Sequence, residues 1–304
     1  MTQGNWRLAR KQEKLIRRAG IRQEIRRFFN ELEFLEVETP QRINANAPEP
    51  HIDAIAADGM WLQTSPELAM KRLLAAGYGN IFQLCRVWRD GERGSKHLPE
   101  FSMLEWYRPN ADYQQLMADC QRLLQALVPS GQLNYQGQTI DLAGPWPRMT
   151  VHEAFDRYAT CSVELAIEND TFEEILTDEV EPKLGLNPLF LTEYPTPLAA
   201  LARTKQDNPA VAERCELYIG GMELANGFSE LVDPIEQRKR FEEDERIRQM
   251  AGKPPYPMPE EFLRELEQMP ESAGMALGID RLIMLLTDAQ QIDDVVAFTP
   301  ADNL

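Results

Sequence analysis

The stretch from Arg86 to Pro109 contains the densest set of residues that could do chemistry in this sequence. It reads RVWRDGERGSKHLPEFSMLEWYRP, with an apolar segment on each side of a short basic one. Clustered cations can neutralise a polyphosphate, an aromatic ring can stack on a purine base, and a carboxylate can pair with a cationic substrate. The residues of these types are Arg89, Arg93, Lys96, His97, Phe101, Glu105 and Tyr107.

Two segments far along the chain add complementary groups. ELANGFSEL (223–231) places Glu223 and Glu230 seven residues apart. Mg²⁺ usually bridges one or two protein carboxylates to substrate phosphate, so this pair predicts a metal site; the alternative is a pair of exposed strand carboxylates. GMALGIDRL (274–282) contains Gly278, and a glycine allows the backbone to approach a nucleotide closely.

The composition is typical of a soluble globular protein, since 43% of the 304 residues are hydrophobic and 27% are charged. The sequence has neither an apolar run of about 18 residues nor a signal-like N-terminus, so we expect a cytoplasmic protein without a membrane anchor. Its four cysteines are scattered, which predicts reduced thiols rather than a disulfide framework or a zinc site.

The formal net charge of −17 argues against a nucleic-acid partner, because such binding depends on Lys and Arg contacts to phosphate. The charge is unevenly distributed: nine Lys or Arg and only two Glu lie between Trp6 and Arg27. This basic segment could dock an acidic partner, or it could be an ordinary solvated helix surface.

Hydrophobic spacing, caps and turn residues predict an α+β fold, with antiparallel strands and flanking helices in one domain spanning 1–304. Ser65 and Pro66 suggest an N-cap and first helical residue, and Thr150 with Glu153 suggests a capping box. The region at about 130–200 is the least regular and is interpreted as an insertion or small subdomain. The predicted helices are 6–32, 65–76, 151–158, 171–180, 234–250 and 279–287, and the predicted strands or extended segments are 34–40, 80–89, 100–108, 188–192 and 212–231.

The three segments, in this order, resemble the catalytic core of class II aminoacyl-tRNA synthetases, and of their lysyl branch in particular. The resemblance covers nearly the whole chain. It implies a mainly antiparallel sheet flanked by helices, and an enzyme that joins an amino acid to the α-phosphate of ATP with Mg²⁺ as cofactor. FLEVETP (34–40) resembles the family's first motif, which implies a homodimer.

The resemblance also assigns roles around ATP. Arg89 matches the arginine that bridges the α-phosphate and the substrate carboxylate, Phe101 the ring that stacks on adenine, and Arg281 the third motif's arginine. Arg89 and Arg281 are the implied catalytic residues. The implied ATP-binding set is Arg89, Asp90, Gly91, Glu92, His97, Leu98, Phe101, Glu223, Leu224, Gly278 and Arg281.

The amino-acid pocket of the lysyl branch is matched as well, with Glu223 and Glu230 in the positions of its Mg²⁺ ligands. A neutral amino acid would leave the pocket carboxylates unpaired, so they favour lysine or an isomer of it. The implied substrate-binding set is Ser65, Pro66, Glu67, Glu105, Tyr107, Asn226, Phe228, Glu230 and Ala276.

One subfamily is resembled most closely, the elongation factor P–(R)-β-lysine ligases, which lack the anticodon-binding domain of lysyl-tRNA synthetases. In that subfamily Ala225 and Ala276 stand where lysyl-tRNA synthetases usually have glycine. The resemblance implies two steps: ATP and β-lysine give a β-lysyl-adenylate, and the ε-amine of a lysine on elongation factor P then displaces AMP.

Two positions depart from the family pattern: Gly91 replaces a glutamate that contacts ATP, and Leu98 replaces an asparagine. Three alternatives therefore stay open. The first is a lysyl-adenylate-forming enzyme with another acceptor, and the second is a catalytically weak paralogue that binds amino acid or nucleotide as a regulator. The third, tRNA aminoacylation, is disfavoured by the acidic charge. The type of lysine and the surface that docks the acceptor are not determined by the sequence.

Overall fold

The protein, seen in a computed structural model, is described over residues 6–300 and 302. It divides into two compact units. The first takes its residues from Met1–Pro109, Val232–Pro270 and Ala276–Leu304, and the second from Asn110–Leu231 and Glu271–Met275. The predicted insertion at about 130–200 falls within the second unit. That 1–304 works as a single catalytic domain stays a prediction.

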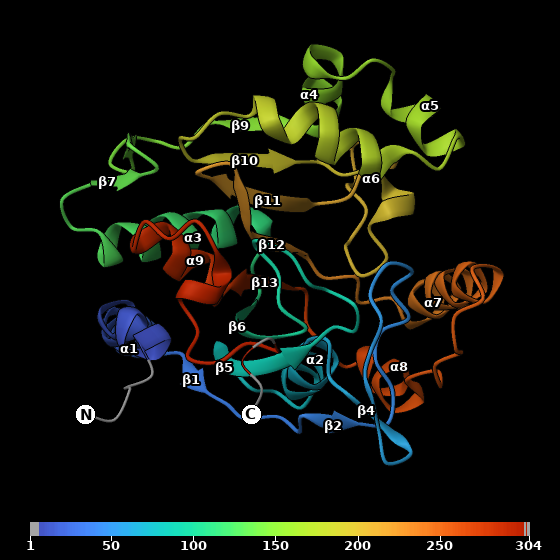
Figure 1. Ribbon diagram of the computed structural model, residues 1–304. Helices are drawn as coiled ribbons and strands as arrows, with labels where there is room; N and C mark the ends of the chain where they lie inside the picture. The colour runs from blue at the N-terminus through green and yellow to red at the C-terminus, as the bar shows by residue number, and fades with distance from the viewer. Residues whose placement is uncertain (1–5, 301, 303–304) are drawn as a thin grey trace. The chain divides into compact units, whose positions relative to one another are not determined.

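The first unit pairs a three-stranded part of a sheet with helices (Figure 1). Its strand order is β1-β5-β6, with β1 parallel to β5 and β5 antiparallel to β6, and a separate small sheet has the order β2-β4-β3. The elements are α1 (Trp6–Glu31), α2 (Glu67–Ala75), α7 (Pro234–Met250), α8 (Glu260–Leu266), α9 (Ile279–Leu286), β1 (Leu35–Glu36), β2 (Arg42–Ile43), β3 (Ala56–Ala57), β4 (Met60–Leu62), β5 (Ile81–Trp88) and β6 (Glu100–Pro109).

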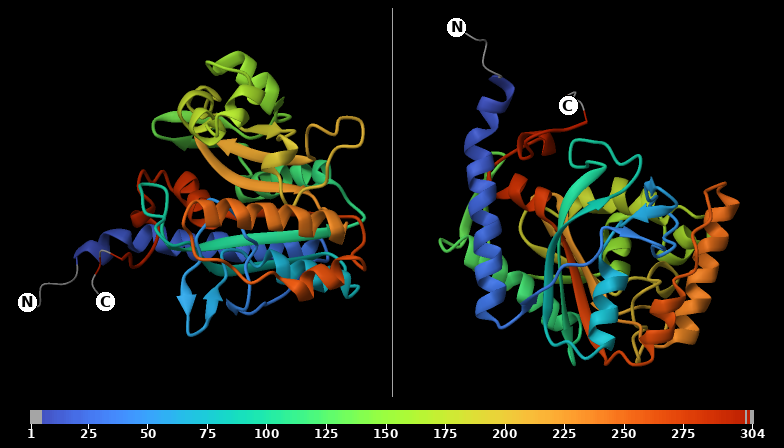
Figure 2. Two further views of the ribbon diagram at one scale, coloured as in Figure 1. Left: turned by 90° about the vertical axis from the view of Figure 1, so that its right-hand side faces the viewer. Right: turned by 90° about the horizontal axis from the view of Figure 1, so that it is seen from below.

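The strand pair β5–β6 positions much of the chemistry that the sequence suggested. It is the longest pair of the first unit, and Figure 2 shows it alongside the long helix α1. Phe101 lies opposite Val87, Glu105 opposite Gln83 and Tyr107 opposite Ile81. Because alternate residues of a strand point to the same side, Phe101, Glu105 and Tyr107 share one face of β6.

The second unit has the strand order β12-β11-β10-β9, in which only β9 and β10 run parallel. Strand β13 (Ser272–Gly278) contributes Ser272–Met275 to this unit and Ala276–Gly278 to the first. The other elements are α3 (Tyr113–Leu127), α4 (Val151–Tyr158), α5 (Val163–Glu168), α6 (Phe172–Ile175), a π-helical turn (Leu176–Val180), β7 (Gln132–Tyr135), β8 (Gln138–Asp141), β9 (Arg148–Thr150), β10 (Leu189–Thr192), β11 (Arg214–Ile219) and β12 (Met222–Ser229).

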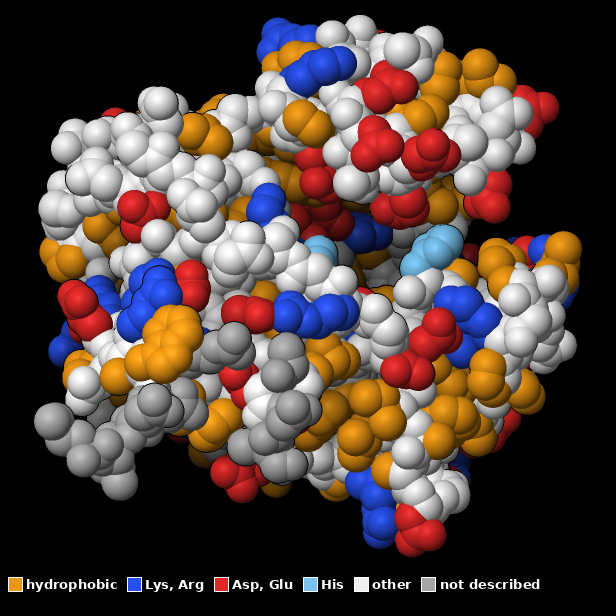
Figure 3. All heavy atoms as spheres, in the orientation of Figure 1, with side chains coloured by type: hydrophobic (Ala, Val, Ile, Leu, Met, Phe, Trp, Pro, Cys, Tyr) orange, Lys and Arg blue, Asp and Glu red, His pale blue; other side chains and the backbone are white. Residues whose placement is uncertain are grey.

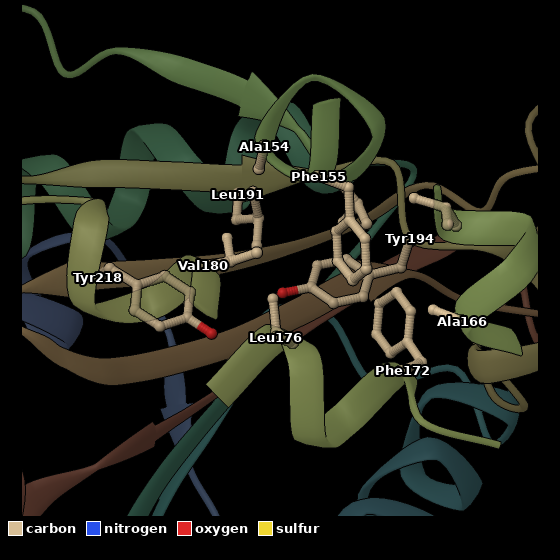
Figure 4. Packing of buried hydrophobic residues seen from close by; sticks show 11 residues of the cluster. Ala154, Phe155, Ala166, Phe172, Leu176, Val180, Leu191, Tyr194 and Tyr218 are labelled. Atoms are coloured by element: carbon tan, nitrogen blue, oxygen red, sulfur yellow. The ribbon is translucent and has the colours of Figure 1, made fainter. Parts of the chain in front are cut away.

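The region that was hardest to interpret from sequence forms a small helical layer over this sheet. Thr150 and Glu153 make the predicted capping box at the start of α4. Phe155 and Phe172 stack with ring centroids 5.0 Å apart, and Figure 4 shows them packed with residues of β10 and β11. The insertion is therefore a packed part of the second unit, with a core that reaches Tyr194 and Tyr218.

Charged side chains of both signs cover the face seen in Figure 3, and acidic ones gather over the α4–α6 region. Residues 151–183 contain ten Asp or Glu against one Arg and one Lys. Much of the acidic excess therefore lies on this helical layer. In the described part of the chain, no helix combines the length and apolarity needed to cross a bilayer.

The predicted α+β class is confirmed, with mostly antiparallel strand pairs and helices in both units. Two expectations need correction in detail. The extended segment 34–40 forms strand only at Leu35–Glu36. Helix α2 begins at Glu67 rather than at Pro66, and the N-cap position belongs to Pro66, which cannot cap with its side chain.

Candidate active site

A buried carboxylate, Glu105, is the centre of the predicted amino-acid pocket in the first unit. Its side chain is 1% exposed. Ser65 Oγ donates to Glu105 Oε1 at 2.7 Å, and the Tyr107 hydroxyl donates to Oε2 at 2.8 Å. Ser65 Oγ also accepts from the N–H of Glu67 at 2.9 Å, so this hydroxyl joins the start of α2 to β6. The predicted residues Ser65, Glu67, Glu105 and Tyr107 are thus brought together.

A buried ion pair lies beside this carboxylate. Lys71 is 0% exposed and its Nζ lies 2.6 Å from Glu67 Oε1, one helical turn earlier in α2. A buried lysine requires such a partner because an isolated charge is costly away from water. Sequence reasoning missed Lys71, although its spacing of four residues from Glu67 is that of a helical ion pair.

Burial raises the pKa of Glu105 to about 7. The neighbouring Glu67 carboxylate raises it further, whereas the Ser65 and Tyr107 hydroxyls and the Lys71 cation oppose the shift. A carboxyl in this state can accept a cation in exchange for its proton. The arrangement is suited to binding an ammonium group.

Arg89 and Phe101 lie together at the end of the β5–β6 pair where the connecting loop 89–99 begins and ends. The Arg89 guanidinium carbon is 5.2 Å from the centre of the Phe101 ring, in cation–π range. Arg89 Nε donates to the Thr64 carbonyl at 3.5 Å, and an Arg89 terminal nitrogen lies 3.8 Å from Glu92 Oε1. Both predicted groups are half-buried, so a ligand can reach them.

The segment after β5 has the backbone geometry of a tight turn. Gly91 has φ +73°, a conformation that favours glycine, and its N–H donates to Asp90 Oδ1 at 3.0 Å. The glycine that departs from the family pattern is therefore well suited to this backbone conformation. Leu98, the other departure, is 3% exposed and belongs to the core.

Arg281 meets the same segment from α9, which begins after Gly278 as predicted. One terminal nitrogen of Arg281 contacts His97 Nε2, and its Nε donates to the Lys96 carbonyl at 3.4 Å. Two predicted ATP-binding side chains from distant parts of the sequence are thus adjacent.

A buried network fixes α9 against β6. Asp280 Oδ2 accepts from the Ser102 N–H at 2.7 Å, and Asp280 Oδ1 forms a short ion pair with Arg18 of α1. Arg18 also donates to Ser102 Oγ at 2.9 Å. Arg18 is 8% exposed, so the basic N-terminal helix is not purely a solvated surface. The network holds Phe101 and Arg281, the sequence neighbours of Ser102 and Asp280.

A β-bulge in the second unit organises the ELANGFSEL segment. Tyr218 pairs with Glu223, Leu217 with Ala225 and Glu216 with Asn226, so that Leu224 is the extra residue. Directly opposed residues share a face, and without the bulge Glu223 and Asn226, three residues apart, would point to opposite faces. Leu224, predicted to bind ATP, is the bulge residue and its side chain is buried; its role at ATP stays a prediction.

The face that carries Glu223 also carries Asn226 and Phe228, the partners of Glu216 and Arg214. Glu230, fully buried, donates its backbone N–H to the Ser272 carbonyl at 2.8 Å. The other predicted positions, Pro66, Ala276 and Gly278, precede α2 or lie in β13.

Glu216 is a candidate site residue that was not singled out from the sequence. The Tyr194 and Tyr218 hydroxyls both donate to its Oε2, and an Arg214 terminal nitrogen lies 2.6 Å from Oε1. Figure 4 labels both tyrosines, whose rings belong to the core beneath α4–α6. The available signal was charge inside the otherwise apolar strand Arg214–Ile219.

The carboxylate of Glu223 affects the pKa of Glu216. Burial raises the pKa of Glu216 and the Glu223 carboxylate raises it further, while Arg214 opposes both effects. The two acids therefore lie near one another on one face of the β11–β12 hairpin. Within residues 6–300 and 302, no cluster of three or more His, Cys, Asp or Glu side chains suited to a metal occurs. A cation here would need ligands from substrate as well as protein.

Comparison with known proteins agrees with this chemistry. The family of class II tRNA synthetases described for D, K and N matches residues 5–302. The chain therefore belongs to the class II aminoacyl-tRNA synthetase family, and it is an ATP-dependent ligase.

Relatives along almost the full length define the group within that family. An elongation factor P–(R)-β-lysine ligase of Histophilus somni strain 2336 is 40% identical over 96% of this chain and 97% of the relative. Proteins of the same name from Erwinia tasmaniensis and Haemophilus influenzae strain PittGG are 43% and 39% identical, over 94% and 98% of each chain. The chain belongs to the family of elongation factor P–(R)-β-lysine ligases.

Proposed function

We propose that this protein activates (R)-β-lysine, or lysine, with ATP and transfers it to the ε-amine of a lysine on elongation factor P. The observation that carries the proposal is the buried carboxyl of Glu105, held by Ser65 and Tyr107, in a chain related to ligases of that name. A neutral substrate would give this carboxyl no cation to pair with, so its burial favours a substrate with an ammonium group.

Activation begins with binding of the diamino acid. One ammonium group pairs with Glu105, whose two hydroxyl donors fix the carboxylate in position. Arg89 contacts the substrate carboxylate and the α-phosphate, and Phe101 stacks on adenine. Arg281 and His97 contact the outer phosphates. Oriented cations of this kind stabilise charge that develops at phosphorus in the transition state.

Transfer follows from the chemistry of the adenylate. The lysine nitrogen of the acceptor attacks the acyl carbon, the bond from this carbon to the phosphate oxygen breaks, and AMP leaves with its electron pair. The attacking amine loses one proton as the amide forms. In the activation step before it, a carboxylate oxygen of the amino acid bonds to the α-phosphorus, and pyrophosphate leaves with the electrons of its bond to that phosphorus. Over the two steps a carboxylate, an amine and ATP are converted to amide, AMP and pyrophosphate.

Mg²⁺ fits the carboxylates of the β11–β12 hairpin, and when bound it would neutralise negative charge on the phosphates. Glu223 is the common member of two candidate pairs, one with Glu230 as predicted from sequence and one with Glu216. Glu216 is supported by its proximity to Glu223.

The two pairs are separated by mutation. Glu223→Gln should raise the Mg²⁺ concentration needed for half-maximal activity in either case. Glu216→Gln should do the same only if Glu216 is a ligand, and Glu230→Gln only if Glu230 is. A metal requirement unchanged in all three variants contradicts the assignment of Mg²⁺ to this hairpin.

A homodimer is also proposed, from the resemblance of 34–40 to the family's interface motif. Exposed apolar residues of the first unit support it, since Leu35 of β1 is 52% exposed and Ile16 of α1 is 67% exposed. Sedimentation of the wild-type protein and of Leu35→Asp tests this proposal. The wild type should be a dimer that Leu35→Asp weakens, and a monomeric wild type would contradict the proposal.

The transfer step is tested with labelled (R)-β-lysine, ATP and purified elongation factor P. Label is expected on the factor, and none on a variant that lacks its acceptor lysine. Label on a different acceptor would favour an adenylate-forming enzyme with another target. Ligand binding without any pyrophosphate exchange would favour a regulatory paralogue.

A further inference from the structure

A fully buried arginine, Arg248, lies near the end of α7, outside every predicted motif. It is 0% exposed. One of its terminal nitrogens donates to the carbonyls of Glu49 and Ile52, each at 2.9 Å, and lies 3.0 Å from Asp53 Oδ1. Its guanidinium carbon is 3.9 Å from the centre of the Tyr256 ring. Such a planar, multiply bonded cation has no equivalent among other side chains.

The two carbonyl contacts and the ion pair of Arg248 all go to one short segment, 49–54. Lys253 adds donors to the Pro50 carbonyl and to Asp53 Oδ2, both at 2.8 Å. The Ala54 N–H donates to the Tyr256 hydroxyl at 2.6 Å. The segment has no helix or strand of its own, so residues of α7 and the loop after it supply its support.

The segment in turn hydrogen-bonds to the start of the loop 89–99, which joins β5 to β6 and contains residues proposed to bind ATP. The Asp53 carbonyl accepts from the Asp90 N–H at 2.7 Å. Asp90 directly follows Arg89, whose own N–H donates to the Pro99 carbonyl at 2.9 Å. The backbone on both sides of the peptide bond between Arg89 and Asp90 is thereby fixed, on one side by Pro99, the residue before β6, and on the other by Asp53.

We infer that Arg248 is a positioning residue for the nucleotide step: through Asp53 it holds the Asp90 backbone, and thereby the direction in which Arg89 leaves β5. The inference rests on the proposed function of Arg89. Arg248 itself touches no reacting atom. Its effect is geometric, and displacement of a catalytic group by about 1 Å can cost roughly a hundredfold in rate.

The test uses two variants and a matched control. Asp53→Asn removes both ion pairs to Asp53 and keeps its carbonyl, and Arg248→Lys keeps the charge but not the several carbonyl contacts. The control is Arg246→Lys on the same helix, where the side chain is exposed and pairs with Glu243. The rate of ATP–pyrophosphate exchange is measured while the concentration of ATP, and separately that of the amino acid, is varied. The melting temperature and the hydrogen exchange of the backbone amides of 86–97 are measured for each protein.

Both variants should lower kcat/KM for ATP by roughly ten- to a hundredfold and leave KM for the amino acid within about twofold. Amide exchange of 86–97 should quicken in both variants, and the control should match the wild type. Unchanged ATP kinetics and amide exchange would overturn the inference. The inference would also be overturned if kcat/KM fell equally for ATP and for the amino acid and in proportion to a lower melting temperature, since that is a purely structural effect. If the wild type makes no adenylate, the proposed function fails, and ATP affinity and amide exchange still decide the inference.

Discussion

At the scale of single residues, Arg89 is the side chain on which the proposed chemistry depends most. We expect Arg89→Ala to lower ATP–pyrophosphate exchange by a factor of about 10² to 10³ or more, because loss of one oriented charge typically costs roughly 3–4 kcal/mol in the transition state. The fold should persist, since the Arg89 side chain is half-buried rather than part of the core.

Arg42→Ala provides the control for this substitution. Arg42 is in the same unit. Its side chain is exposed and lies 3.7 Å from Asp58, which is also exposed. It should keep normal exchange. Near-normal exchange in Arg89→Ala with an intact circular dichroism spectrum would contradict the site assignment.

Glu105 predicts how amino-acid binding depends on pH. Its pKa is raised to about 7, and an ammonium group binds the ionised form. The apparent affinity for the amino acid should therefore rise as pH increases through 7 and level off above it. In Glu105→Gln the affinity should be weaker and should lack this rise. If the affinity for the amino acid depended on pH in the same way in wild type and variant, the assignment of Glu105 to the amino-acid pocket would be contradicted.

The same group affects stability with the opposite sign. The pKa of Glu105 in the folded protein lies above the ordinary glutamate value of 4.5, so the folded protein holds this proton more tightly than the unfolded chain. Its contribution to the free energy of unfolding is present below pH 4.5 and is lost as pH rises to about 7. Denaturant unfolding of ligand-free wild type should therefore lose stability relative to Glu105→Gln across this window.

At the scale of elements, the β11–β12 hairpin requires a close approach at Gly227. A Cβ there would lie 2.8 Å from the Gly274 carbonyl oxygen and 2.6 Å from Met275 Sδ. We expect Gly227→Ala to destabilise the protein by about 1–3 kcal/mol, because backbone must shift to make room. Thermal unfolding measures the change.

Gly20→Ala is the matched glycine control. Gly20 lies within α1, and nothing is within 4 Å of an added Cβ. It should be neutral or stabilise by up to about 1 kcal/mol, because alanine is a better helix former. A Gly227→Ala protein as stable as the wild type would show that this strand contact is not tight.

Several elements with strong local signals were predicted from sequence, but α3 was missed although Asp112 caps it and one of its faces is apolar. Elements set by tertiary context were not predictable. Helix α1, the capping box of α4, the β5–β6 pair and α7 were all predicted. Strand β13 was missed because its glycine- and alanine-rich sequence has no periodicity. The bulge at Leu224 was missed because nothing local shows which residue of a strand goes unpaired.

The residues of the candidate site also fall into two groups, those proposed from the sequence and those recognised only in the structure. Motif residues such as Glu105 and Arg281 were found through their order along the chain. Lys71, Glu216 and Arg248 were not, because each matters through partners that only the fold supplies. A buried ion pair such as that of Lys71 is visible in sequence only as one helical spacing among many.

At the scale of the whole molecule, net charge constrains the acceptor. A chain of net charge −17 is poorly matched to a polyanion. We expect transfer of labelled amino acid to elongation factor P and none above background to tRNA under the same conditions. Stable, nuclease-sensitive label on tRNA would contradict this expectation and support aminoacylation instead.

The most direct test of the central claim is ATP–pyrophosphate exchange by the purified protein with (R)-β-lysine, with L-lysine and with no amino acid. The account predicts exchange that depends on the diamino acid, is strongest with (R)-β-lysine and is lost in Arg89→Ala. Preference for L-lysine would point to an acceptor other than elongation factor P. No exchange with either amino acid would contradict adenylate formation by this protein.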